Sequence, residues 1–128
     1  MANEQKGLTI GFLNAAVAST AYQYHGVYVN PDSEWALAQA GQRSVGVLQN
    51  TPGADEPAEV MVDGVTKAVA GAAITAGAAV SVDASGHFIP ATDADQIAGV
   101  ALDSAGASGD IFTLWLGYRG EFQLSSPA

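Results

Sequence analysis

The chain of 128 residues contains no cysteine, which excludes disulfide bonds, thiol catalysis and cysteine-ligated zinc or iron. It also lacks a long hydrophobic run. The longest apolar stretch, residues 68–80, is rich in alanine and glycine and falls short of the roughly 20 residues of a membrane span. No basic and then apolar leader is visible at the start. We therefore expect no membrane partner and a protein that stays in the compartment where it is made.

Basic residues are scarce as well. Lysine and arginine together number four, against thirteen aspartate and glutamate residues, and the formal net charge is -9. Such a chain repels phosphate backbones instead of releasing their counterions, so direct nucleic-acid binding is not expected. The acidic residues are scattered among small and polar ones. We interpret this pattern as keeping the protein soluble at high copy number rather than as an acidic recognition face.

The residue patterns of catalytic, metal and cofactor sites are also missing. The two histidines, His25 and His87, stand in no spacing typical of metal ligands. Ser108 lies outside a G-x-S-x-G elbow, and the Asp93-Ala-Asp95 segment offers only the first three positions of a calcium loop. No glycine-rich phosphate loop is present. We therefore expect no enzyme activity, no cofactor and no metal site.

Short runs of β-branched and aromatic residues, separated by turn formers, predict an all-β fold in a single domain. The pair Asp63-Gly64 between two valine-rich runs predicts a two-residue type I′ turn and a hairpin over residues 58–69. For residues 33–42 we favour a strand, with a short helix as the alternative. For residues 68–79 we favour a loop or a join between strands, again with a short helix as the alternative. Strands are expected at residues 27–29, 35–38, 45–48, 60–62, 65–69, 79–82, 87–89, 97–102, 111–116 and 118–124.

The sequence contains an internal repeat. Residues 27–64 align with residues 80–117 without a gap when the second segment is shifted by 53 positions, and turn formers then match turn formers. In this alignment Trp35 faces Phe88 and Met61 faces Leu114. We interpret the two segments as pseudo-repeats that close around one shared interior.

The segment before the repeat has two interpretations. Residues 1–22 either form an extended N-terminal arm, with residues 23–124 as the β domain, or contribute another strand of the same sheet over Leu8 to Leu13. Residues 125–128 are expected to be a loose tail.

The second repeat resembles a known family in its spacing of turn glycines and strand apolar residues. The resemblance covers about residues 72–124 and is to the cement, or decoration, proteins of tailed-phage capsids. It implies a small β-barrel or β-tulip-like domain, bound to the exterior of the virion head, often as a trimer, and made in the host cytoplasm. The phrases that carry it are Val80-Ser-Val-Asp83, Ser85-Gly86, Ile89-Pro-Ala91, Ile97-Ala-Gly-Val-Ala-Leu102 and Ile111-Phe-Thr-Leu-Trp-Leu-Gly117.

The function implied by this resemblance is to stabilise the assembled head by bridging neighbouring subunits of the major capsid protein. An apolar N-terminal segment that adds to a capsid strand fits that role. We expect Trp115 in the core and leave Trp35 open between core and contact. The alternative is a phage surface domain that binds a receptor or glycan through exposed aromatic residues; a small hydrolase or metal enzyme is disfavoured. The candidate contact residues are Leu8, Ile10, Phe12, Leu13, Tyr22, Tyr24 and Trp35.

Overall fold

The computed structural model describes residues 5–11, 13–16, 22–38, 46–92 and 97–116, and all its regular elements in these ranges are strands. The prediction of an all-β fold is confirmed. No helix in the described part of the chain is long and apolar enough to cross a membrane. The strands are β1 (Gln5–Ile10), β2 (Gly26–Val29), β3 (Trp35–Leu37), β4 (Gly46–Leu48), β5 (Val60–Val69), β6 (Ala79–Val82), β7 (Phe88–Pro90), β8 (Gly99–Ala101) and β9 (Ile111–Trp115).

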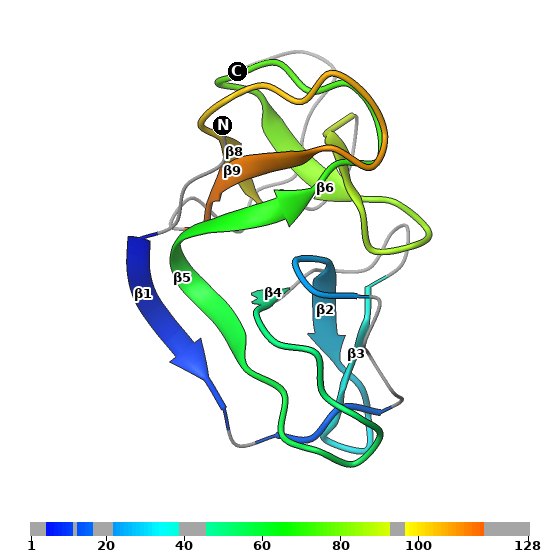
Figure 1. Ribbon diagram of the computed structural model, residues 1–128. Helices are drawn as coiled ribbons and strands as arrows, with labels where there is room; N and C mark the ends of the chain where they lie inside the picture. The colour runs from blue at the N-terminus through cyan, green and yellow to red at the C-terminus, as the bar shows by residue number, and fades with distance from the viewer. Residues whose placement is uncertain (1–4, 12, 17–21, 39–45, 93–96, 117–128) are drawn as a thin grey trace.

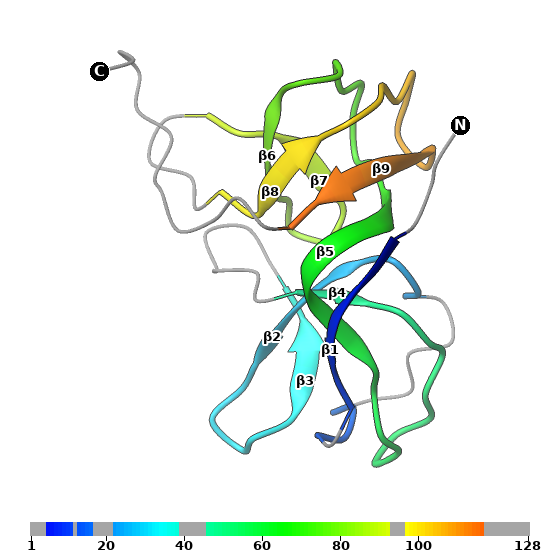
Figure 2. The ribbon, with the colours of Figure 1, turned by 90° about the vertical axis from the view of Figure 1, so that its left-hand side faces the viewer.

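The strands form one curled antiparallel sheet, a small barrel-like arrangement. Their order is β3-β2-β4-β5-β9-β8-β6-β7, and β1 pairs with β5 beside this path. The long β5 runs through both halves of the molecule, with β1 to β4 around its first part and β6 to β9 around its second part (Figures 1 and 2). Because β5 belongs to both groups, it joins the two halves into one sheet.

The two halves repeat the same pairing pattern. Each bound of β6, β7 and β8 lies 53 residues after the corresponding bound of β2, β3 and β4. The registers also correspond, since Val27 pairs with Leu37 in the first half and Val80 pairs with Pro90 in the second. Over three strands, the sequence repeat is therefore a structural repeat.

The ungapped alignment is wrong at the fourth strand. Val47 pairs with Met61, and its equivalent Val100 pairs with Trp115, so the partners differ by 54 residues instead of 53. The loops explain the change. Asn50 and Asp103, 53 apart, each accept a backbone hydrogen bond from the following strand region, whereas the next turns, Gly53 to Glu56 and Ala107 to Asp110, are 54 apart. One extra residue therefore lies between positions 103 and 107.

The N-terminal segment belongs to the first half. Ala15 forms a parallel bridge with Trp35, and Ala70, directly after β5, forms the same kind of bridge with Phe88. β1 pairs along β5 with two register irregularities. The described part of this segment therefore contains a strand at Gln5–Ile10 and isolated bridges at Asn14 and Ala15, and Ala15 occupies in the first half the place that Ala70 occupies in the second.

The predicted hairpin at Asp63-Gly64 is wrong, because β5 continues unbroken through both residues. β1 pairs with β5 on both sides of the glycine, β4 pairs with the part before it and β9 with the part after it, so the chain does not reverse there. Gly64 has φ of 126°, and a Cβ there would lie 2.8 Å from Cα of Gly7. Glycine is therefore required at this position because the backbone of β1 approaches β5 closely, and not because the chain turns.

Neither segment with a helical alternative is helical where it is described. Residues 35–37 form β3, and residues 68–79 hold the end of β5, a loop and two isolated bridges. The expected strand at residues 118–124, the tail at residues 125–128 and the candidate calcium segment at Asp93 to Asp95 lie outside the described residues.

The cores of the two halves are filled by different pairs of side chains. In the second half Phe88 and Phe112 are fully buried and meet edge to face, with ring centroids 6.3 Å apart. The equivalent positions in the first half hold Trp35 and Ala58, which are also buried. The first half thus combines a large indole ring with a small alanine, whereas the second half combines two phenyl rings. Both pairs fill the core at the same backbone positions.

Candidate binding surface

The candidate contact residues do not share one surface. Leu8 on β1 is 60% exposed, whereas Trp35 on β3 is only 3% exposed and belongs to the core of the first half. Phe12 lies outside the described residues. The rest are half-buried and pack partly against core clusters: Ile10, Leu13, Tyr22 and Tyr24. Of this set, Leu8 alone is an exposed apolar side chain among the described residues.

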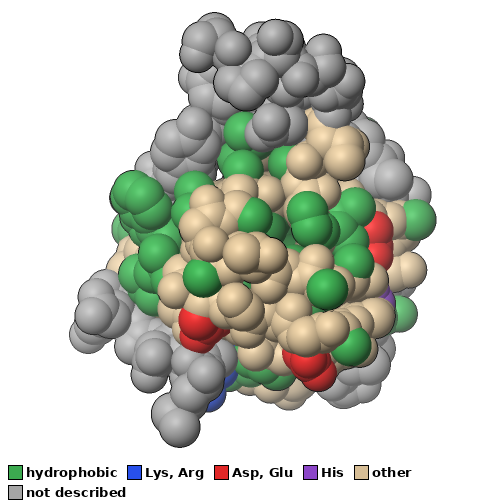
Figure 3. All heavy atoms as spheres, turned by 90° about the horizontal axis from the view of Figure 1, so that it is seen from above, with side chains coloured by type: hydrophobic (Ala, Val, Ile, Leu, Met, Phe, Trp, Pro, Cys, Tyr) green, Lys and Arg blue, Asp and Glu red, His purple; other side chains and the backbone are tan. Residues whose placement is uncertain are grey.

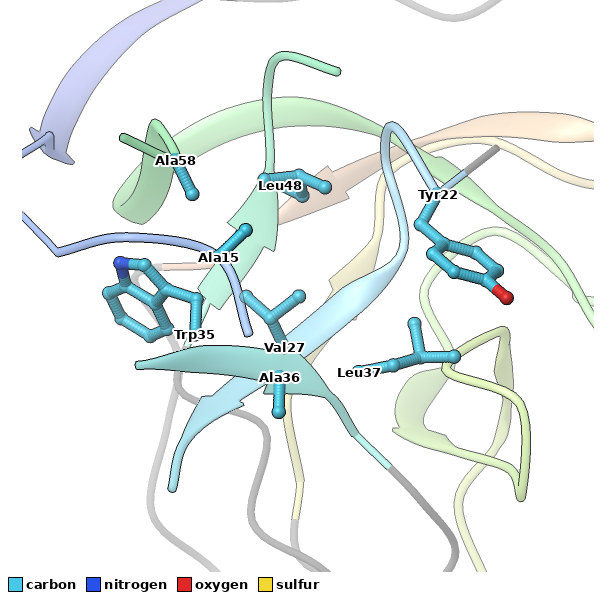
Figure 4. A pocket seen from close by; sticks show the side chains of 8 residues that line it. All are labelled: Ala15, Tyr22, Val27, Trp35, Ala36, Leu37, Leu48 and Ala58. Carbon is cyan, nitrogen blue, oxygen red and sulfur yellow. The ribbon is translucent and has the colours of Figure 1, made fainter. Parts of the chain in front are cut away.

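Trp35 lies at the edge of a small apolar pocket between β3 and the segment around Ala15 (Figure 4). Its indole Nε1 is buried and has no hydrogen-bond partner among the described residues. An unsatisfied buried donor costs stability, so the apolar area of the ring must offset it. Trp35 is accordingly a packing residue. The pocket is lined by Ala15, Tyr22, Val27, Trp35, Ala36, Leu37, Leu48 and Ala58.

Trp115, expected in the core, is instead 41% exposed. It ends β9, where Phe112 and Leu114 point inward, and it therefore points to the opposite face together with Ile111, which is 42% exposed. Leu102, beyond the end of β8, is 50% exposed. Figure 3 shows the molecule from the side of the second half. The described part of this face carries many apolar side chains, with acidic ones near its margins.

Several polar side chains that could serve in a functional site instead form hydrogen bonds within turns. Asn30 Oδ1 accepts hydrogen bonds from the backbone N–H groups of Asp32 and Glu34. Asp83 Oδ1 does the same for Ser85 and His87, 53 positions later. These are side chain to backbone bonds of the kind that fixes tight turns. The repeated acidic and amide residues are therefore explained by turn formation.

The two histidines meet between the halves of the molecule. The rings of His25 and His87 lie 4.7 Å apart, and His87 Nδ1 is 3.6 Å from Asp83 Oδ2. Desolvation by burial lowers the pKa of His25 below its usual 6.5; a hydrogen bond to the Gln23 carbonyl opposes this shift, and repulsion from His87 adds to it. In the described part of the chain, no group of three or more metal-ligating side chains is arranged around an ion site.

His25 is expected to make the protein less stable in mild acid. Because its folded-state pKa is lowered, the unfolded chain takes up a proton first as the pH falls through about 6.5, and unfolding becomes easier until the folded-state pKa is passed. Above that window both states are neutral and the effect vanishes. Denaturant unfolding between pH 8 and 5 should show this loss, and His25→Gln should remove part of the slope. Identical slopes for both proteins would contradict the assignment.

Known structures share this fold. The chain is similar to the N base of the head fiber gp8.5 of bacteriophage phi29, with a TM-score of 0.67 and 19% sequence identity over 89% of this chain and 99% of that chain. At this identity the likeness establishes the fold alone. No curated protein matches the chain. The family described as phage cement protein matches residues 4–116, a range that contains all the residues the structure describes, and the chain therefore belongs to the phage cement protein family.

Proposed function

We propose that the protein binds the outer surface of the assembled phage head and stabilises it by bridging neighbouring subunits of the major capsid protein. Its membership of the phage cement protein family carries this proposal, because that membership makes it a structural protein associated with the phage head. The protein would be made in the host cytoplasm and added to the exterior of the virion. Its net charge of -9 disfavours contact with the negatively charged packaged DNA.

The strand β1 is the part of the fold that best suits contact with the shell. In the described structure β1 pairs with β5 on one edge, and Leu8 at its centre is 60% exposed. An edge strand can extend a neighbouring sheet through main-chain hydrogen bonds, and an apolar side chain beside it adds contact area. Ile10, Leu13, Tyr22 and Tyr24 are half-buried near this segment or the core and remain secondary candidates.

The physical mechanism is linkage between binding and assembly. A protein that binds a junction between shell subunits, and not the separated subunits, shifts the equilibrium toward the intact shell. Modest contacts suffice, because many copies act on one shell and several contacts by one oligomer reinforce each other. The compact sheet, joined by β5, supplies a rigid body for such bridging.

Leu8→Asp is expected to reduce binding to purified bare shells by about tenfold or more, since an unpaired carboxylate would enter an apolar contact. Ile111→Asp is the matched control, because this residue is also exposed and receives the same charge. Occupancy is measured by sedimenting the shells and imaging them. Point substitution is preferable to removing residues 1–20, because Ala15 packs in the core.

Equal binding by wild type and Leu8→Asp, with loss in Ile111→Asp, would contradict the assignment of β1 as the contact. Failure of the wild-type protein to bind shells, together with binding to host cells or glycans, would contradict the proposed function itself.

A further inference from the structure

The two histidines of the chain come together where its two halves meet. They lie far apart in the sequence, but the fold places their rings with centroids 4.7 Å apart and planes inclined by 45°. His25 directly precedes β2 in the first half, and His87 directly precedes β7 in the second half. Next to them the Gly26 N–H donates a hydrogen bond to the Gly86 carbonyl at 2.8 Å. The positions of both rings are therefore set by the joint between the two halves.

Each ring uses its Nδ1 atom for a contact within its own half. His25 Nδ1 lies 3.2 Å from the carbonyl oxygen of Gln23, and His87 Nδ1 lies 3.6 Å from Oδ2 of Asp83. Both neighbours are acceptors, so they favour the tautomer with the proton on Nδ1 and leave the lone pair on Nε2. A carbonyl or carboxylate behind the ring is also what orients the histidine ligands of metal ions and makes them more basic.

The separation of the two rings suits two imidazoles on one metal ion. With a metal–nitrogen bond of about 2.1 Å, the centroid of a bound imidazole lies about 3.2 Å from the ion. When the two bonds meet at a right angle, as in a six-coordinate ion, the centroids are about 4.5 Å apart, and at the tetrahedral angle they are about 5.2 Å apart. The observed 4.7 Å falls between these values.

The histidine pair is open to solvent on one side. The side chain of His87 is 30% exposed, whereas His25 is 7% exposed. The ring of Tyr22 meets His25 edge on, with centroids 5.4 Å apart, and restricts its rotation. Among the described residues no third side chain completes a metal centre around the pair. Water would therefore fill the remaining coordination positions, as in an exchangeable site and not as in a closed structural centre.

We propose that His25 and His87 together bind one divalent transition-metal ion through their Nε2 atoms, and that the ion clamps the first half of the chain to the second. Imidazole nitrogen is a suitable ligand for Ni²⁺, Cu²⁺ and Zn²⁺, whereas Mg²⁺ and Ca²⁺ prefer oxygen ligands. Because the two rings meet only in the folded chain, the ion stabilises the fold. The site lies within one chain and does not depend on the shell contact proposed for β1.

Titration of the untagged full chain with Ni²⁺ tests the site, with calorimetry for the affinity and thermal unfolding for the stability. The wild-type protein is expected to bind one Ni²⁺ per chain and to unfold at a higher temperature as the Ni²⁺ concentration rises. Mg²⁺ should leave the unfolding temperature unchanged. His87→Gln should weaken Ni²⁺ binding by about tenfold or more. Glu34→Gln is the matched control, because Glu34 holds the place of His87 in the equivalent turn of the first half.

Asp83→Asn separates the metal site from the turn that carries it. Asn30 forms the equivalent turn of the first half through its amide oxygen, so an amide should preserve the turn while the carboxylate behind His87 is lost. Ni²⁺ binding is expected to weaken by about tenfold, with the metal-free stability unchanged. Circular dichroism verifies that each variant folds. No Ni²⁺ binding by the wild-type protein, equal stabilisation by Mg²⁺, or wild-type Ni²⁺ affinity in His87→Gln would overturn the proposal and leave the proposed function standing.

Discussion

Replacing Phe112 with alanine is expected to lower the free energy of unfolding by about 3–5 kcal/mol, the usual cost of removing a buried aromatic ring. Phe112 has no exposed surface and packs edge to face on Phe88, so its loss removes buried area and leaves a cavity. Denaturant titration followed by tryptophan fluorescence measures the change. Ile111→Ala, one position earlier and 42% exposed, is the control and should cost less than about 1 kcal/mol.

The internal repeat predicts a rescue of this variant. The first half holds Trp35 and Ala58 where the second holds Phe88 and Phe112, so Phe88→Trp should fill part of the cavity that Phe112→Ala leaves. Residues in contact couple by about 0.5–3 kcal/mol, and recovery within that range is expected. It should be incomplete, because the new indole N–H, like that of Trp35, would lack a partner. A double variant no more stable than Phe112→Ala would contradict the equivalence of the two cores.

The strands and turns were largely predictable because the turn chemistry is local. Asn30 and Asp83 accept hydrogen bonds from the backbone two and four residues later, so each turn is specified by its own short sequence. The same turn formers recur at a spacing of 53 residues, and the repeat is therefore visible in the sequence alone.

The error at Asp63-Gly64 arose because a local signal has a non-local cause. Positive φ at glycine is typical of a hairpin turn, and Gly64 does have positive φ. The reason for it is the approach of Gly7, more than fifty residues away in the sequence. No pattern confined to neighbouring residues distinguishes a turn from such a close approach of two strands.

The wrong prediction that Trp115 lies in the core has a similar origin. Alternation along β9 shows which residues share a face, but not which face is interior. The extra residue between positions 103 and 107 shifts β9 by one, so the ungapped alignment placed Leu114, instead of Trp115, opposite Met61. A shift of one residue moves every side chain of a strand to the other face. The apolar sequence around Leu8 predicts a contact there, and Leu8 is exposed, whereas the exposure of Leu102 and Trp115 depends on how the strands pack and could not be predicted from the sequence.

Decorated shells are expected to resist dissociation more than bare shells, and this is the central claim. If the protein binds only the assembled state, each site contributes about 2.7 kcal/mol at a concentration one hundred times the dissociation constant, and the total rises with the number of copies bound. The wild-type protein should therefore produce a large effect, and Leu8→Asp a much smaller one at the same concentration.

The most direct test is a thermal or denaturant melt of purified bare shells titrated with the protein, followed by light scattering. The midpoint of shell dissociation should rise with protein concentration and level off when the sites are full. An unchanged midpoint on shells that imaging shows to be fully decorated would contradict the account.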